Sequence, residues 1–187
     1  LEGTNLDNGL VIQDESGNEY VWIEVPKSLY AESSYNTKTT TADQKPTSST
    51  DYDKIEYCLH KYTDYYRRDK NGTLTSFKDT YYSDAATGLT SEQYTQLKQK
   101  MLKSVYQNGG FYIGKYETGT ETPRTSVDLS IAPTETPVIK PNVYPYNCVT
   151  CSQAQTLATT KMESGDRTTS LMFGVQWDLV MKYLETK

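Results

Sequence analysis

"TSEQYTQLKQKMLKSVYQNGGFYIGKYETG", residues 90–119, contains a helix pattern that passes directly into a strand pattern. Thr90 and Gln93 have the spacing of a capping box, and Gly109 is typical of the residue that follows a helix. "FYIGKYETG" then has the composition of a strand. The apolar side chains between the two signals fall on one helical face: Tyr94, Leu97, Met101, Leu102 and Val105. A helix followed at once by a strand predicts an α+β fold.

The flanking segments extend this pattern. "GLVIQDESGNEYVWIEVP" (9–26) predicts a β-hairpin with a turn at 14–17, and "STDYDKIEYCLHKYTDYYRR" (49–68) predicts a helix capped by Ser49 or Thr50. "CSQAQTLATTKME" (151–163), capped by Thr150 or Ser152, predicts another helix. The Pro- and Thr-rich stretch 120–142 predicts a surface loop. We therefore expect low regular secondary structure overall.

Length and charge limit the class of protein. The 187 residues suffice for one domain over 1–187, and the polar stretch after Pro26 begins an insertion that we place at 27–89. A formal net charge of −5 and a pI near 5.0 argue against nucleic acid as a partner. No apolar run approaches the ~20 residues of a membrane helix, so we expect no membrane span.

Tyrosine is the most unusual component, with 17 residues. A group of them falls in the insertion, where tyrosine offers a large and fairly rigid contact surface. Packing of a second helical layer explains the same residues equally well. The candidate ligand-binding residues are Tyr62, Tyr65, Tyr66, Tyr81 and Tyr82.

Cysteine and histidine give weak signals for chemistry. Cys148 and Cys151 form a Cys-x-x-Cys, which suits a redox pair or half of a zinc site, but free cysteine also packs as a small hydrophobe, and we favour packing. His60 is the only histidine, and we expect it on a solvated helix face. We therefore predict no catalytic residue, no metal ligand and no cofactor in this chain.

Four phrases together resemble the formylglycine-generating-enzyme-like family, also called the sulfatase-modifying-factor domain. They are "EYVWIEVP" (19–26), "GGFYIGKYETG" (109–119), "YPYNCVTCSQAQTLA" (144–158) and "SLMFGVQWDLVMKYL" (170–184). The resemblance implies a C-type-lectin-like fold and is nearest to Gram-positive bacterial members with surface or prophage associations. Residues in or beside these phrases are expected to be structural: Trp22, Tyr112, Tyr116, Cys148, Cys151 and Trp177.

The chain also departs from that family. The family's paired catalytic cysteines, and most of its calcium-binding loops, belong to a part that would follow Lys187. The resemblance thus implies a noncatalytic recognition module, extracellular or on a cell surface or phage particle, that binds a protein or glycan through loops. The alternative is the N-terminal part of a formylglycine-generating-type oxidase, with calcium possible in the part that would follow.

"LMFGVQWDLVMKYLETK" (171–187) predicts a last helix, which supports a further expectation. Trp177, Val180, Met181 and Leu184 share one helical face, and an apolar face of this kind must be buried. We therefore expect that Lys187 is not the natural end: either a loop is cut there and a second polypeptide completes the same domain, or the chain pairs with another chain over this face.

Overall fold

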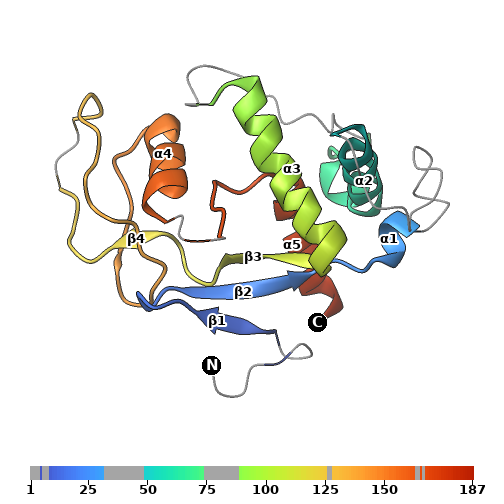
Figure 1. The fold of residues 1–187 in the computed structure, drawn as a ribbon, viewed down its shortest axis with the longest axis horizontal. Coiled ribbons are helices and arrows are strands. Elements are labelled where there is room, and N and C mark those ends of the chain that lie inside the picture. The colour runs from blue at the N-terminus through green and yellow to red at the C-terminus, as the bar shows by residue number, and fades with distance from the viewer. Residues whose placement is uncertain are drawn as a thin grey trace. The chain divides into compact units, whose positions relative to one another are not determined.

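The computed structural model describes residues 5, 9–31, 49–73, 89–125, 128–162, 165 and 167–187 (Figure 1). It confirms a mixed α+β class with small antiparallel sheets and little regular structure. The described elements, in chain order, are β1 (Val11–Gln13), β2 (Glu19–Glu24), α1 (Ser28–Ala31), α2 (Ser49–Tyr62), the 3₁₀ helix η1 (Asp64–Arg67), α3 (Ser91–Asn108), β3 (Gly110–Gly114), β4 (Gly119–Thr120), β5 (Tyr144–Pro145), α4 (Cys151–Lys161) and α5 (Gly174–Thr186).

The predicted hairpin is confirmed by the pairing of β1 with β2. The strands are antiparallel, with Val11 opposite Val21 and Ile12 opposite Tyr20. Asp14 closes the turn, since its Oδ1 accepts the backbone N–H groups of Ser16 (3.0 Å) and Asn18 (2.9 Å). This is the local bonding by which aspartate favours turns. The hairpin continues into a three-stranded sheet of order β1-β2-β3 (Figure 1).

The long helix α3 begins and ends where its sequence signals predict. Thr90 N donates to Gln93 Oε1 (3.0 Å), and Gln93 N donates to Thr90 Oγ1 (3.2 Å), which is the reciprocal capping box. Gly109 follows the helix with φ +81°, a conformation that is costly for any residue with a Cβ. The chain leaves this glycine directly into β3.

The helix at 49–68 is confirmed in its centre and differs at its ends. The first turn of α2 contains both Ser49 and Thr50, which we expected as caps. Ile55 and Leu59 are buried as predicted, but the helix ends at Tyr62 and continues as η1. Tyr66 therefore belongs to the 3₁₀ turn and not to the α-helical face.

The stretch 120–142 is not a surface loop throughout, which corrects our expectation. Val138 and Ile139 are buried, and Val138 bridges Gly119. Ile139 accepts from Glu19 N (2.9 Å) through its carbonyl and donates its own N–H to Asn18 Oδ1 (2.7 Å). These bonds hold the end of the stretch against the hairpin turn and the start of β2.

β4 and β5 form a separate two-stranded antiparallel sheet. Gly119 in β4 faces Val143 so closely that a Cβ on it would lie 2.4 Å from Val143 Cγ2. Such a distance is far inside van der Waals contact, so only glycine fits this position.

Contacts divide the chain into two compact units, each composed of three segments. Unit 1 comprises 1–22, 80–97 and 112–171, and unit 2 comprises 23–79, 98–111 and 172–187. In unit 1, Tyr20, Ile139 and Met162 form a buried cluster on which Tyr116 packs. Among the described residues, unit 2 contains these buried apolar side chains: Ile23, Val25, Leu29, Ile55, Cys58, Leu59, Met101, Leu102, Val105, Phe111, Phe173, Val175, Leu179 and Val180. A single domain over 1–187 stays a prediction.

Helix α5 turns a different face inward from the one we expected. Val175, Leu179 and Val180 are buried, whereas Trp177 is 58% exposed and Leu184 is 63% exposed. Asp178 is also buried, and it pairs with a partly buried arginine of unit 2, Arg67. Of the predicted apolar face, only Val180 is buried, and Met181 is half-buried.

Candidate functional site

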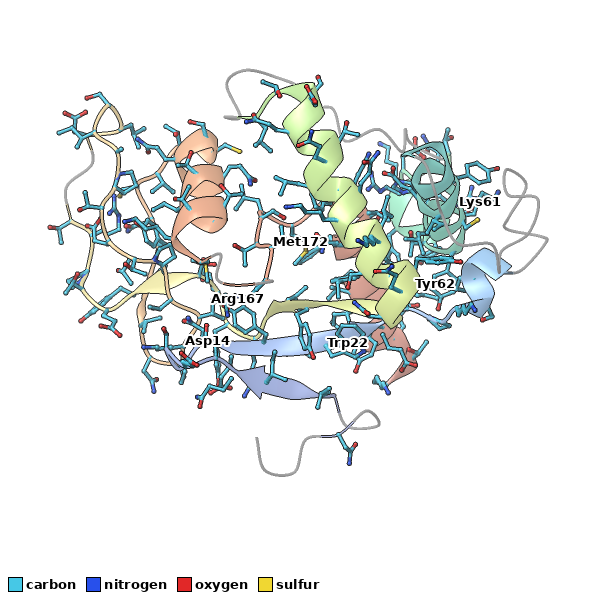
Figure 2. The ribbon with its side chains drawn as sticks, viewed as in Figure 1. Asp14, Trp22, Lys61, Tyr62, Arg167 and Met172 are labelled. Atoms are coloured by element: carbon cyan, nitrogen blue, oxygen red, sulfur yellow. The ribbon has the colours of Figure 1, made fainter. Side chains whose placement is uncertain are left out.

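The predicted ligand-binding tyrosines that the structure describes lie where α2 passes into η1. Tyr62 is the last residue of α2 (Figure 2), and Tyr65 and Tyr66 lie in η1. Buried Thr63 makes the junction, since its N–H (3.1 Å) and its Oγ1 (3.0 Å) both donate to the Leu59 carbonyl. Tyr81 and Tyr82 lie outside the described residues.

An ion pair fastens η1 to α5 within unit 2. Arg67 Nε donates to Asp178 Oδ2 at 2.5 Å, and both side chains are largely buried. A buried charge is stable only with a partner in good hydrogen-bonding geometry. The pair therefore fixes how η1 meets α5, and it restricts the position of Tyr65 and Tyr66, which directly precede Arg67 in η1.

Two of the tyrosines face α5. Lys182 Nζ lies 5.6 Å from the centroid of the Tyr62 ring, a cation–π distance. Glu185 lies beside Tyr66, and burial of the hydroxyl together with this carboxylate raises the pKa of Tyr66 to about 12. Tyr62, at the end of α2, and Tyr66, in η1, thus contribute to the packing of these two elements on α5.

Tyr65 is the tyrosine of the three that faces solvent, at 73% exposed. Its ring meets that of Tyr66 in an edge-to-face arrangement, with centroids 5.6 Å apart and an interplanar angle of 82°. On α5, the exposed side chains of Trp177 and Leu184 are seven residues apart and so lie on one helical face. We call Tyr65 and Trp177 the exposed aromatic set.

His60 is buried, which corrects the expectation of a solvated helix face. It is 3% exposed, and its Nε2 lies 3.2 Å from Glu56 Oε1. Glu56 in turn pairs with Lys98 Nζ at 3.0 Å, which joins α2 to α3. Burial alone would raise the pKa of Glu56, but the hydrogen bond from His60 and the charge of Lys98 outweigh it and hold that pKa below its usual value. This arrangement fits a buried structural network between two helices.

The three aromatic residues of unit 1 that we expected to be structural occupy two places. The rings of Trp22 (Figure 2) and Tyr112 pack at 4.8 Å between centroids, with Trp22 half-buried and Tyr112 exposed. Tyr116 packs on the cluster of Tyr20, Ile139 and Met162, and Lys115 Nζ lies 5.1 Å from its ring centroid. Trp177, the fourth aromatic residue that we expected to be structural, lies on the exposed face of α5 described above.

The two cysteines of the Cys-x-x-Cys lie at the start of α4. Cys148 precedes the N-cap Thr150, and Cys151 is the first residue of the helix. Neither forms a disulfide in the structure; Cys148 is half-buried and Cys151 is exposed. An exposed thiol fills no space in a core, so the packing interpretation does not fit Cys151.

Comparison with family models, with curated proteins and with solved structures finds no match to this chain. Among the described residues, no three His, Cys, Asp or Glu side chains come together in a way that could hold a metal ion. None of the helices that the structure describes combines the length and apolar composition needed to cross a membrane.

Several charged residues that position the aromatic side chains are absent from the sequence-based predictions. Arg67, Asp178 and Glu185 act across the contact between η1 and α5. The sequence does contain a pattern for the two acidic residues, Asp178 and Glu185. They are seven residues apart and so share a helical face beside that of Trp177. Their partners, however, are more than 110 residues away in the chain and no local pattern identifies them.

Proposed function

We propose that this chain is a noncatalytic recognition module that binds a protein or glycan ligand through exposed aromatic side chains. The observation that carries the proposal is the exposed aromatic set of unit 2, in which Tyr65 and Trp177 present more than half of their surface to solvent. Large aromatic side chains are enriched in binding surfaces because they supply contact area at a low cost in conformational entropy.

The support beneath this set favours binding over random exposure. Tyr65 follows the α2–η1 junction fixed by Thr63, and Trp177 precedes Asp178, whose carboxylate is held by Arg67. Side chains on a backbone held in this way lose little freedom when a ligand arrives, and this lowers the cost of binding.

The type of scaffold and the location that we propose rest on the resemblance to formylglycine-generating-enzyme-like proteins. On that basis the scaffold is of the C-type-lectin-like kind and works outside the cell, at a cell surface or on a phage particle. The buried position of the only histidine agrees with a noncatalytic role, because a histidine-based hydrolase needs that ring within reach of its substrate.

A glycan array and a displayed-peptide library, each probed with the purified chain, test the proposal. We expect a ligand from one of the two, with affinity reduced about tenfold or more in Tyr65→Ala and Trp177→Ala. Ile131→Ala, which truncates an exposed apolar side chain of unit 1, is the matched control and should bind normally. Binding that survives both aromatic substitutions would refute the proposed surface.

The oxidase alternative has a direct assay of its own. The chain is incubated with copper and a cysteine-containing peptide of the sulfatase type, and the peptide is examined by mass spectrometry. We expect an unmodified peptide; formylglycine in the product would replace the recognition proposal with the enzymatic one.

A further inference from the structure

The Cys-x-x-Cys has an environment that neither packing nor metal binding explains. Cys151 is exposed, Cys148 is half-buried, and only Val149 and Thr150 separate them. Two thiols so close in sequence, with one open to solvent, can exchange with disulfides in solution. We propose that Cys148 and Cys151 form a redox-active pair that undergoes thiol–disulfide exchange with small disulfides such as oxidised glutathione.

The backbone on the Cys148 side is held by one arginine. Arg124 donates from Nε to the Asn147 carbonyl (3.0 Å) and from Nη2 to the Cys148 carbonyl (3.4 Å). The same guanidinium pairs with Glu135 and lies 4.9 Å from the centroid of the Tyr146 ring. These contacts restrict the segment that carries the first thiol.

The backbone on the Cys151 side is held by the capping box of α4. Thr150 N donates to Gln153 Oε1 (2.9 Å), and Gln153 N donates to Thr150 Oγ1 (3.1 Å). Gln153 Nε2 also donates to the carbonyls of Leu129 and Ile131. Hydrogen bonds therefore restrict the backbone on both sides of the two residues that separate the cysteines. This restriction reduces the conformational entropy lost when the two thiols form a disulfide.

The exchange proceeds in two steps. The thiolate of Cys151, the more exposed residue, attacks one sulfur of the small disulfide; an S–S bond to Cys151 forms, and one small thiolate leaves. The thiolate of Cys148 then attacks the Cys151 sulfur, closes the internal disulfide and expels the second small thiolate. The protein loses two electrons and two protons, and the small disulfide is reduced to two thiols.

Cys58 provides an internal control. It is fully buried, and burial raises its pKa to about 11, so that it holds little of the reactive thiolate. In the folded protein, a reagent that attacks exposed thiols should therefore leave Cys58 unmodified. Cys58 should react with such a reagent only after the protein unfolds.

The test incubates the fully reduced protein with oxidised glutathione, quenches with acid and maps the peptides by mass spectrometry. We expect a disulfide between Cys148 and Cys151, reversed by excess dithiothreitol, with Cys58 still reduced. Cys148→Ser should stop at a stable glutathione adduct on Cys151, and Cys151→Ser should react about tenfold more slowly. The same incubation in urea measures the contribution of the fold, and internal closure relative to the adduct should fall by about tenfold.

Three results would overturn the proposal. One is a wild-type protein that keeps all its thiols reduced, and another is a wild-type adduct on Cys151 that Cys148 never displaces. The third is closure that is as efficient in urea as in the folded protein, because it would show that proximity in the sequence is the whole cause. Peptide maps of the wild-type protein, with and without urea, distinguish all three results, so that the test does not depend on the folding of either serine variant.

Discussion

Asp14 holds several groups at the residue scale. One carboxylate oxygen accepts two backbone N–H groups of the hairpin turn, and the other accepts from Asn18 Nδ2 (3.0 Å) and Arg167 Nη1 (3.0 Å; Figure 2). Burial alone would raise the pKa of Asp14, but these hydrogen bonds and the arginine charge outweigh it and hold the pKa below its usual value. The charged form is therefore the one that stabilises unit 1.

We expect Asp14→Asn to lower the free energy of unfolding by about 1 kcal/mol at pH 7. Since the pKa is lower in the folded state, this stabilisation is complete above the unfolded pKa of about 3.9 and is lost as pH falls through the folded value. The gap between wild type and variant should thus close below about pH 3.9.

Urea unfolding followed by circular dichroism between neutral and acidic pH measures this gap. Glu24→Gln removes an exposed carboxylate at the end of β2 and is the charge-matched control, with an expected change within about 0.5 kcal/mol. A gap that stays constant with pH would show that the carboxylate charge of Asp14 is not the source of its effect.

At the element scale, α4 depends strongly on its first turn. Three of its eleven residues are threonine, which has a modest helix propensity, and its buried side is limited to Gln155, Leu157 and Ala158. The capping box of Thr150 and Gln153 satisfies backbone N–H groups that the helix itself leaves unpaired. The cap is therefore a main determinant of where α4 begins.

Thr150→Ala should cost about 1 kcal/mol of unfolding free energy, and Thr150→Ser should recover most of it because serine retains the accepting oxygen. Thr156→Ala is the control, since Thr156 lies on the exposed side of the same helix and alanine favours helix there. Hydrogen exchange of the first-turn amides should accelerate in Thr150→Ala alone. Equal losses at positions 150 and 156 would contradict the capping role.

At the scale of the whole molecule, long-range contacts bring together residues that no local pattern connects. Arg67 and Asp178 are 111 residues apart in the sequence, yet their contact joins η1 to α5 within unit 2. Glu56 and Lys98 likewise join α2 to α3. Both pairs are mostly buried, so each carries the cost of desolvation and depends on its partner.

Removal of either member of the Arg67–Asp178 pair should leave a buried charge without its partner. We expect Asp178→Asn to cost about 3 kcal/mol of unfolding free energy, and Arg67→Met with Asp178→Leu to cost less than the sum of the single changes. Arg68→Met, which breaks the exposed pair with Asp64, should cost under about 1 kcal/mol. Strict additivity in the double variant would show that the two side chains do not interact.

The sequence alone determined those features whose bonds span about four residues. The capping box at Thr90, the stop at Gly109 and the hairpin turn at Asp14 are correct predictions because each partner is a near neighbour in the chain. The structure selects Thr150 from the two caps, Thr150 and Ser152, that the sequence offered for α4. Faces of helices with a clear apolar stripe, such as α3, were equally predictable.

Only the tertiary structure decided which side chains are buried in segments whose sequence allows more than one face to turn inward. His60 and Ile139 turned inward against expectation, and Trp177 turned outward, because burial depends on segments distant in the sequence that supply partners for polar groups and cover for apolar ones. The same holds for Tyr62 and Tyr66, which face α5, and for Tyr65, which does not. Composition could nominate all three tyrosines, but contacts across more than a hundred residues separate the exposed one from the two that pack.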